Sequence, residues 1–199
     1  MASVLYEILA TLFPPQCAVC NAVGSGLCDR CAPGSAARVT VRLRTLRLAA
    51  LGRYEASLRQ AVLALKAGRR DVAAELGRRL AACIEPASAL VPVPTTRARR
   101  LQRGFDGAVL LAQIAADRAN ACVLPSLEQI AGDAQRGRDR SARLAACGRF
   151  AWRGESSLSG RRVVLLDDVA TTGATLEDCA ATIRAAGGIV DEAVVVAWA

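Results

Sequence analysis

Hydrophobic and polar positions along the chain follow two periods, that of a strand and that of a helix. Short apolar runs bounded by turn residues predict strands over residues 46–54, 89–93, 122–124, 162–166 and 189–197. Helical spacing between these runs predicts helices over residues 55–84, 103–120 and 174–186, with a break near Gly68 in the first. In the second helix, the side chains predicted to point inward are Phe105, Val109, Leu110 and Ile114. Because strands alternate with helices, we expect an α/β fold in which helices cover both faces of a parallel sheet.

An amphipathic segment precedes the first of these elements. Its apolar positions are Leu5, Ile8, Leu9, Leu12 and Phe13, and Pro14 and Pro15 end it. The polar face lacks lysine and arginine, which favours packing on the body of the protein over a membrane-surface role. Glu7 interrupts the apolar stretch, no basic region precedes it, and no segment reaches the roughly 20 apolar residues of a membrane span. We therefore expect a cytoplasmic protein with no membrane partner.

Composition narrows the chemistry open to the chain. Of its 199 residues, 53% are hydrophobic, and the formal net charge is +8. The absence of histidine excludes His-based acid–base catalysis, Ser-His-Asp triads and His-containing metal sites. Arginine supplies the positive charge almost alone, since Lys66 is the only lysine. This balance suggests an anionic partner, such as nucleic acid, phosphate or a membrane surface, or else serves solubility.

Two Cys-x-x-Cys turns form a compact module near the N-terminus. They supply four thiolates, Cys17, Cys20, Cys28 and Cys31, the ligand set that tetrahedral Zn²⁺ accepts. We predict structural zinc, with a redox pair or disulfides as the alternatives. All four ligands come from the protein, which argues against an open catalytic site. The module either staples a segment too small to fold alone, which we favour, or binds DNA or a partner.

A stretch rich in proline, glycine, serine and alanine over residues 32–37 marks a boundary. We expect residues 1–37 to form the N-terminal helix and zinc ribbon, and residues 38–199 to form the α/β domain. The other cysteines show no ligand spacing and are expected to be small core or surface residues: Cys83, Cys122, Cys147 and Cys179.

The most informative motif spans residues 163–175, with the sequence VVLLDDVATTGAT. An apolar strand ends in Asp167 and Asp168, where open α/β sheets bind ligands. A loop with three threonines and Gly173 then leads into a helix whose N-terminus favours an anion. Hydroxyl groups or a metal suit the aspartates and a phosphate suits the loop, so a ribose 5-phosphate would satisfy both. No Gly-Lys-Ser/Thr is present, which excludes a P-loop.

This motif resembles the phosphoribosyl-pyrophosphate (PRPP) motif of type I phosphoribosyltransferases. The wider arrangement resembles the ComF family, in which a four-cysteine zinc module precedes a phosphoribosyltransferase domain. Supporting segments are CAVC and CDRC, Tyr54 followed by Lys66-Ala67-Gly68, VPVPTTRARRLQRGF over residues 91–105, Gln135, and Phe150. The family implies a link to natural competence and DNA uptake, without a settled substrate.

The resemblance also implies roles for particular residues. Asp167 and Asp168 would hold the ribose hydroxyls of PRPP, with Mg²⁺ nearby. Residues of the following loop would hold the 5-phosphate: Val169, Ala170, Thr171, Thr172, Gly173, Ala174 and Thr175. Lys66, Arg97 and Arg103 would face the pyrophosphate, and an arginine-rich loop over residues 132–149 would close over the site. That loop carries Arg136, Arg138, Arg140 and Arg143, and further arginines, Arg99 and Arg100, lie near Arg97.

Two segments depart from the family pattern. Family members typically carry Asn-Gln after Arg-Gly-Phe, whereas Asp106 and Gly107 stand there in this chain. An asparagine often follows an arginine before Phe150, whereas Leu144 follows Arg143 here. Both segments lie near the expected base or pyrophosphate, so they bear on base recognition and turnover.

A second interpretation is a non-enzymatic competence factor that binds single-stranded DNA or a helicase on the same scaffold. Clustered arginines and a zinc ribbon fit phosphate contacts. Aromatic residues make up only 4% of the chain, so platforms for stacking bases are few, and Trp152 is the one well-placed candidate.

Overall fold

The computed structural model describes residues 14–86, 88–130, 146–147, 149–154 and 158–199. The expected N-terminal helix and most of the arginine-rich loop, including Gln135 and its four arginines, lie outside the described residues. The strands are β1 (Val39–Arg42), β2 (Arg47–Arg53), β3 (Ala89–Pro92), β4 (Cys122–Val123), β5 (Leu127–Gln129), β6 (Ala146–Cys147), β7 (Phe150–Trp152), β8 (Arg162–Ala170) and β9 (Ile189–Trp198). The helices are α2 (Ala56–Lys66), α3 (Arg70–Leu80), α4 (Arg97–Arg103), α5 (Gly107–Ala119) and α7 (Ala174–Ala185), with 3₁₀ turns η1 (Ser35–Ala37) and η2 (Ala81–Cys83).

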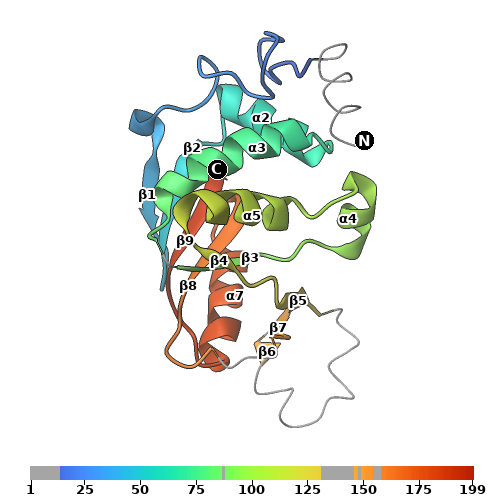
Figure 1. The fold of residues 1–199 in the computed structure, drawn as a ribbon. Coiled ribbons are helices and arrows are strands. Elements are labelled where there is room, and N and C mark those ends of the chain that lie inside the picture. Colours follow the sequence, from blue (N-terminus) through green and yellow to red (C-terminus); the bar gives the residue numbers. More distant parts are fainter. Residues whose placement is uncertain (1–13, 87, 131–145, 148, 155–157) are drawn as a thin grey trace.

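A six-stranded sheet in the order β1-β2-β9-β8-β3-β4 forms the centre of the molecule (Figure 1). All neighbouring pairs are parallel except β1–β2, a hairpin that places an antiparallel strand at one edge. The predicted α/β class with a mostly parallel sheet is confirmed. Ligands of such sheets bind beyond the carboxyl ends of the strands, and β8 brings its aspartates to that end between β9 and β3.

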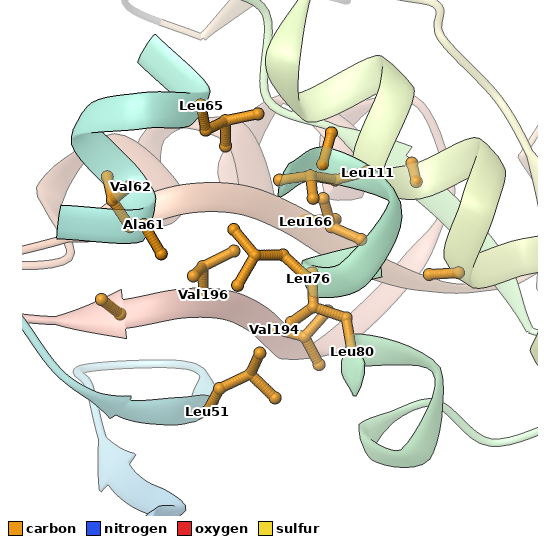
Figure 2. Close-up of a cluster of buried hydrophobic side chains, with 14 of the residues drawn as sticks. Leu51, Ala61, Val62, Leu65, Leu76, Leu80, Leu111, Leu166, Val194 and Val196 are labelled. Carbon is orange, nitrogen blue, oxygen red and sulfur yellow. The ribbon is translucent and has the colours of Figure 1, made fainter. Parts of the chain in front are cut away.

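Buried clusters cover both faces of this sheet. On one face, α2, α3 and α5 pack on the strands, and Leu76 meets Leu166 there (Figure 2). On the other face α7 packs, and Ile183 lies in the same cluster as Leu165. Successive residues of a strand point to opposite faces, so β8 contributes to both clusters. That is why residues 163–166 are apolar without alternation.

A second, three-stranded antiparallel sheet, in the order β5-β7-β6, lies beside α7 (Figure 1). Its buried side chains, Leu127 and Phe150, join the α7 cluster. The sequence did not predict this small sheet. Residues 146–147 were expected to belong to a loop, and that expectation is wrong because they pair with β7.

The helix predicted over residues 103–120 begins later, at Gly107, because Arg103 is the last residue of a separate helix, α4. Gly104 adopts the left-handed conformation, with φ 75°, and ends α4, and Asp106 then caps α5. The expected inward face of α5 is also shifted, because Leu111 is fully buried whereas Ile114 is only half-buried. Ile114 instead packs against Gly77 of α3, where a Cβ would lie 2.8 Å from it. Small residues let these two helices approach closely.

Candidate functional site

Asp167 and Asp168 lie within β8, since the strand continues beyond the predicted end at residue 166 to Ala170. As neighbours in a strand, they point to opposite faces of the sheet. Asp168 faces the side of α2 and α4, where it meets two cations. Asp167 faces the side of α7, where its charge raises the pKa of the buried Cys179 thiol, after burial itself. The pair therefore presents two carboxylates from adjoining positions at one edge of the sheet.

Two cations flank the Asp168 carboxylate. Nζ of Lys66 and Nη1 of Arg103 each lie 3.8 Å from Oδ2 of Asp168. The side chains of Arg103 and Asp168 are 12% and 16% exposed, which places the cluster in a partly desolvated position. At this separation the groups interact as charges without a short hydrogen bond.

The C-terminal ends of two helices deliver these cations. α2 ends at Lys66 and α4 ends at Arg103, so each basic side chain lies at the negative end of its helix dipole. Gly68, with φ 99°, turns the chain directly after α2, and a Cβ there would lie 3.4 Å from the Arg103 carbonyl oxygen. The two helix ends thus meet over Asp168. This convergence explains why a lysine followed by Ala-Gly and an arginine followed by Gly-Phe belong to one site.

The carboxyl group of Asp167 has a higher pKa than a free aspartate. Burial raises its pKa to about 8, and the neighbouring charge of Asp168 acts in the same direction. The backbone N–H of Asp168 donates to Oδ1 of Asp167 at 2.7 Å and opposes the shift. Asp106, at the N-cap of α5, adds a smaller repulsion, so it lies close enough for its charge to be felt. Sequence reasoning had noted Asp106 only as a departure from the family pattern.

The loop after β8 has the form expected of an anion site. Thr171, Thr172 and Ala174 are exposed, and Thr175 is half-buried. Gly173 is the N-cap of α7 in the left-handed conformation, with φ 75°, and it offers no capping side chain. Thr172 Oγ1 accepts from the N–H of Ala174 at 3.3 Å. The first turn of α7 is thus open toward solvent at its positive end.

A cavity of about 660 Å³ lies between the end of β3, the strand that pairs with β8, and the small sheet. Pro92, Thr95 and Asp106 form one side, and Leu127 and Gln129 of β5 form the other. Arg100 of α4 also lines it. Asp106, which lines the cavity, is also one of the charges that raise the pKa of Asp167. The space is large enough for a small organic molecule beside a ribose.

The four cysteines of the N-terminal module converge. Sγ atoms of Cys17, Cys20, Cys28 and Cys31 all lie within 4.8 Å of one another. The backbone N–H of Cys28 donates to Sγ of Cys17 at 3.5 Å. Burial opposes ionisation of Cys17, but such N–H···S bonds outweigh it and lower its pKa to about 6. The residues therefore fit a thiolate-bound metal ion, and Zn²⁺ suits this donor set.

The cysteine module packs tightly on α3. Cys17 and Leu27 are buried in the same cluster as Val72 and Leu76. Gly26 allows this approach, because a Cβ there would lie 2.5 Å from the backbone of Asp71. At the edge of the contact, Arg79 Nη2 donates to Asp29 Oδ1 at 2.7 Å. The cysteine module and the α/β domain thus share part of one hydrophobic core.

The structure brings together Lys66, Arg103, Asp167 and Asp168, and it places the loop from Val169 to Thr175 directly after them. Arg97 is the first residue of α4, and Arg99 and Arg100 are exposed on the same helix. Cys83 and Cys122 are half-buried and Cys179 is fully buried, as expected of cysteines without a ligand role. Within the part of the chain that is described, no helix is both long and apolar enough to cross a membrane.

Comparison with known proteins gives structural neighbours only. No protein-family model matches the chain, and no curated protein matches it. The chain is similar to glutamine PRPP amidotransferase from B. subtilis, with 19% identity and a TM-score of 0.47 over 67% of this chain and 30% of that one. It is also similar to orotate phosphoribosyltransferase from Aeropyrum pernix, with 24% identity and a TM-score of 0.37 over 62% of this chain and 56% of that one. A hypoxanthine phosphoribosyltransferase from Staphylococcus aureus shows 14% identity and a TM-score of 0.35 over 63% and 60% of the two chains. The chain therefore spans less than two thirds of the length of each.

Proposed function

We propose that this chain is a ComF-like phosphoribosyltransferase that binds PRPP. The observation that carries the proposal is that a pair of carboxylates and a candidate phosphate-binding loop lie next to each other at the end of β8. The Asp167–Asp168 pair stands directly before a glycine-containing loop that opens onto the N-terminus of α7. Carboxylates suit the 2- and 3-hydroxyls of a ribose, and the loop suits its 5-phosphate. The sequence motif over residues 163–175 has the same order of parts.

The basic side chains beside Asp168 are suited to bind the pyrophosphate group of PRPP. Lys66 and Arg103 already stand beside this carboxylate, and each is a donor that suits phosphate oxygens. Arg97 would join them from the first turn of α4. Mg²⁺ bound with PRPP would add positive charge at the leaving group, and Asp167 and Asp168 offer carboxylates that suit such an ion. The basic side chains hold the pyrophosphate as negative charge grows on it.

The proposed reaction is a substitution at C1 of the ribose. A nitrogen lone pair of the acceptor forms a bond to C1, and the bond from C1 to the pyrophosphate oxygen breaks. Pyrophosphate leaves with the bonding electrons, and the acceptor nitrogen loses a proton. The cavity bounded by Thr95, Asp106 and Leu127 is the proposed acceptor site, because Pro92 in its lining pairs with Leu166, the residue before Asp167.

We propose that the cysteine module holds structural Zn²⁺ within an N-terminal unit over residues 1–37, which packs on the α/β unit over residues 38–199. Four protein ligands would complete a tetrahedral site, and the burial of Cys17 and Leu27 against α3 suits a stapling role.

A competence factor without enzymatic turnover is the second candidate. It is favoured by the surface of α4, where Leu101 is 72% exposed between arginines. That surface would suit the phosphates of single-stranded DNA or an acidic helicase partner. On this view, PRPP binding would be absent or would serve only as a signal.

Calorimetric titration with PRPP and Mg²⁺ tests the proposal. We expect micromolar binding by the zinc-loaded protein, and its loss in an Asp167→Asn/Asp168→Asn variant. An Asp117→Asn/Asp191→Asn variant is the matched control, because both of those aspartates are exposed away from the site. Folded, zinc-loaded protein that fails to bind PRPP would overturn the enzyme proposal and favour the DNA or partner role.

A further inference from the structure

The turn between β1 and β2, residues 43–46, is fastened to α7 through every polar group of Thr45. Its N–H donates to Glu177 Oε1 at 2.7 Å, and its hydroxyl donates to Glu177 Oε2 at 2.5 Å. The same hydroxyl accepts from Arg184 Nη1 at 2.7 Å, and Arg184 Nη2 donates to the Thr45 carbonyl at 3.2 Å. Thr45 and α7 are thus joined by four hydrogen bonds across a sequence separation of more than a hundred residues. We call this set the Thr45 clamp.

Glu177 is a buried carboxylate at the start of α7. It lies in the first turn of α7, one turn from the proposed phosphate loop, and its own N–H donates to the Gly173 carbonyl at 3.0 Å. Its side chain is buried, with 7% of the residue exposed. A buried carboxylate is costly unless it is fully hydrogen-bonded, and both oxygens of Glu177 are bound by Thr45. Arg44, at 3.9 Å, adds a positive charge.

The other end of the turn touches the phosphate loop itself. Leu43 closes the turn through its N–H, which donates to the Leu46 carbonyl at 2.9 Å. Its side chain lies directly on Gly173, where a Cβ would be 2.6 Å from Leu43 Cδ1. Gly173, which has a left-handed backbone conformation, is therefore covered by a turn that is hydrogen-bonded to α7.

We propose that Thr45 and Glu177 are positioning residues for the 5-phosphate loop. The inference rests on the proposed function, because it assigns a role within that site. The Thr45 clamp fixes the β1–β2 turn on α7, and Leu43 of that turn fixes Gly173. The N–H groups at the start of α7 are thereby held in the direction of the phosphate before it binds. Neither Thr45 nor Glu177 touches the ligand, and both act through Leu43 and the helix.

The test compares two ligands and two matched substitutions of one residue. Thr45→Val removes the hydroxyl that donates to Glu177 and accepts from Arg184, whereas Thr45→Ser keeps it. Dissociation constants are measured for ribose 5-phosphate, which needs the loop, and for Mg-pyrophosphate, which does not. We expect Thr45→Val to weaken ribose 5-phosphate binding about tenfold. Thr45→Ser should bind it with a dissociation constant within about twofold of wild type. Mg-pyrophosphate binding should be unchanged in both.

Two further variants keep the test decisive. Thr40→Val, on the exposed side of the same hairpin, should bind both ligands like wild type. Leu43→Ala leaves the hydrogen bonds of the clamp in place but removes the contact with Gly173, and it answers the question if Thr45→Val does not fold. It should also weaken ribose 5-phosphate binding selectively.

The outcomes separate this inference from the proposed function. Ribose 5-phosphate binding by wild type that survives unchanged in Thr45→Val and Leu43→Ala would overturn the positioning role and leave the proposed function standing. Equal weakening of both ligands would also overturn it, since that indicates a general loss of structure. Folded wild-type protein that binds no ribose 5-phosphate would overturn both.

Discussion

Lys66, the only lysine of the chain, places its Nζ 3.8 Å from Oδ2 of Asp168. The chain uses arginine at every other basic position, including Arg103, whose Nη1 lies 3.8 Å from the same oxygen. An ammonium is a compact charge with rotatable donors, whereas a guanidinium is a rigid fork. The two cations thus offer different geometries to one pyrophosphate.

Replacing Lys66 should therefore weaken PRPP binding specifically. We expect Lys66→Gln to raise the Kd for PRPP about 10- to 100-fold, the effect of losing about 1.5–3 kcal/mol of charged hydrogen bonding. Folding stability should change by less than about 1 kcal/mol, because the pair is partly exposed. Calorimetry and thermal unfolding measure the two effects. Arg59→Gln, on the exposed side of α2, is the control, and an unchanged Kd in Lys66→Gln would remove this residue from the site.

Asp167 should make the stability of the protein depend on pH. Burial raises its pKa from 3.8 to about 8, so the folded state holds a proton that the unfolded state has lost. Its stabilising contribution is complete below about pH 4 and declines as pH rises toward 8. Asp167→Asn stays neutral and keeps the acceptor for the Asp168 N–H, so its advantage over wild type should grow with pH.

Urea unfolding at pH 5.5, 7 and 8.5 measures this difference. At pH 8.5 we expect the free energy of unfolding of Asp167→Asn to exceed that of wild type by about 1–3 kcal/mol, the cost of a half-buried, incompletely paired carboxylate. Asp117→Asn should follow wild type at every pH, since it is exposed. Parallel curves for wild type and Asp167→Asn would show that Asp167 ionises normally.

The cysteine module should contribute to the stability of the whole protein. Its Cys17 and Leu27 share a buried cluster with α3, so loss of the metal would loosen that helix as well. We expect one Zn²⁺ per chain, and chelation should lower the melting temperature by about 10 °C. Cys28→Ser should have the same effect, and Cys83→Ser should keep both the zinc and the stability. Zinc content close to zero in folded wild-type protein would contradict the assignment.

Patterns of neighbouring residues predicted much of this architecture and site. They did not predict contacts between residues that are far apart in the sequence. The β8–α7 unit was predictable because its apolar run, aspartates and glycine are consecutive. The short edge strand β1 was missed, since its residues alternate between half-buried and exposed positions and form no apolar run. The Thr45–Glu177 contact gave no signal at all, because 132 positions separate the two residues. Only the parallel pairing of β2 with β9 and the packing of α7 bring them together.

Substitution by alanine should be more destabilising at Gly173 than at Gly160, a glycine of similar backbone conformation. Gly173 and Gly160 have φ 75° and 69°, so alanine costs about 1–2 kcal/mol of conformational strain at either position. Only Gly173 has a close neighbour, since a Cβ there would lie 2.6 Å from Leu43, whereas nothing lies within 4 Å at Gly160. Overpacking should add about 1–3 kcal/mol at Gly173 alone.

A double-mutant cycle separates strain from overpacking at this position. In a Leu43→Ala background the overpacking is relieved, so Gly173→Ala should cost no more than Gly160→Ala. Unfolding free energies of the single and double variants in urea give the coupling directly. Ribose 5-phosphate affinity can be measured for the same variants. Gly173→Ala should weaken binding more than Gly160→Ala does, because it also displaces the start of α7. If the two glycines responded alike in stability, the contact between Leu43 and the loop would carry no energy, and the turn could not position the phosphate site.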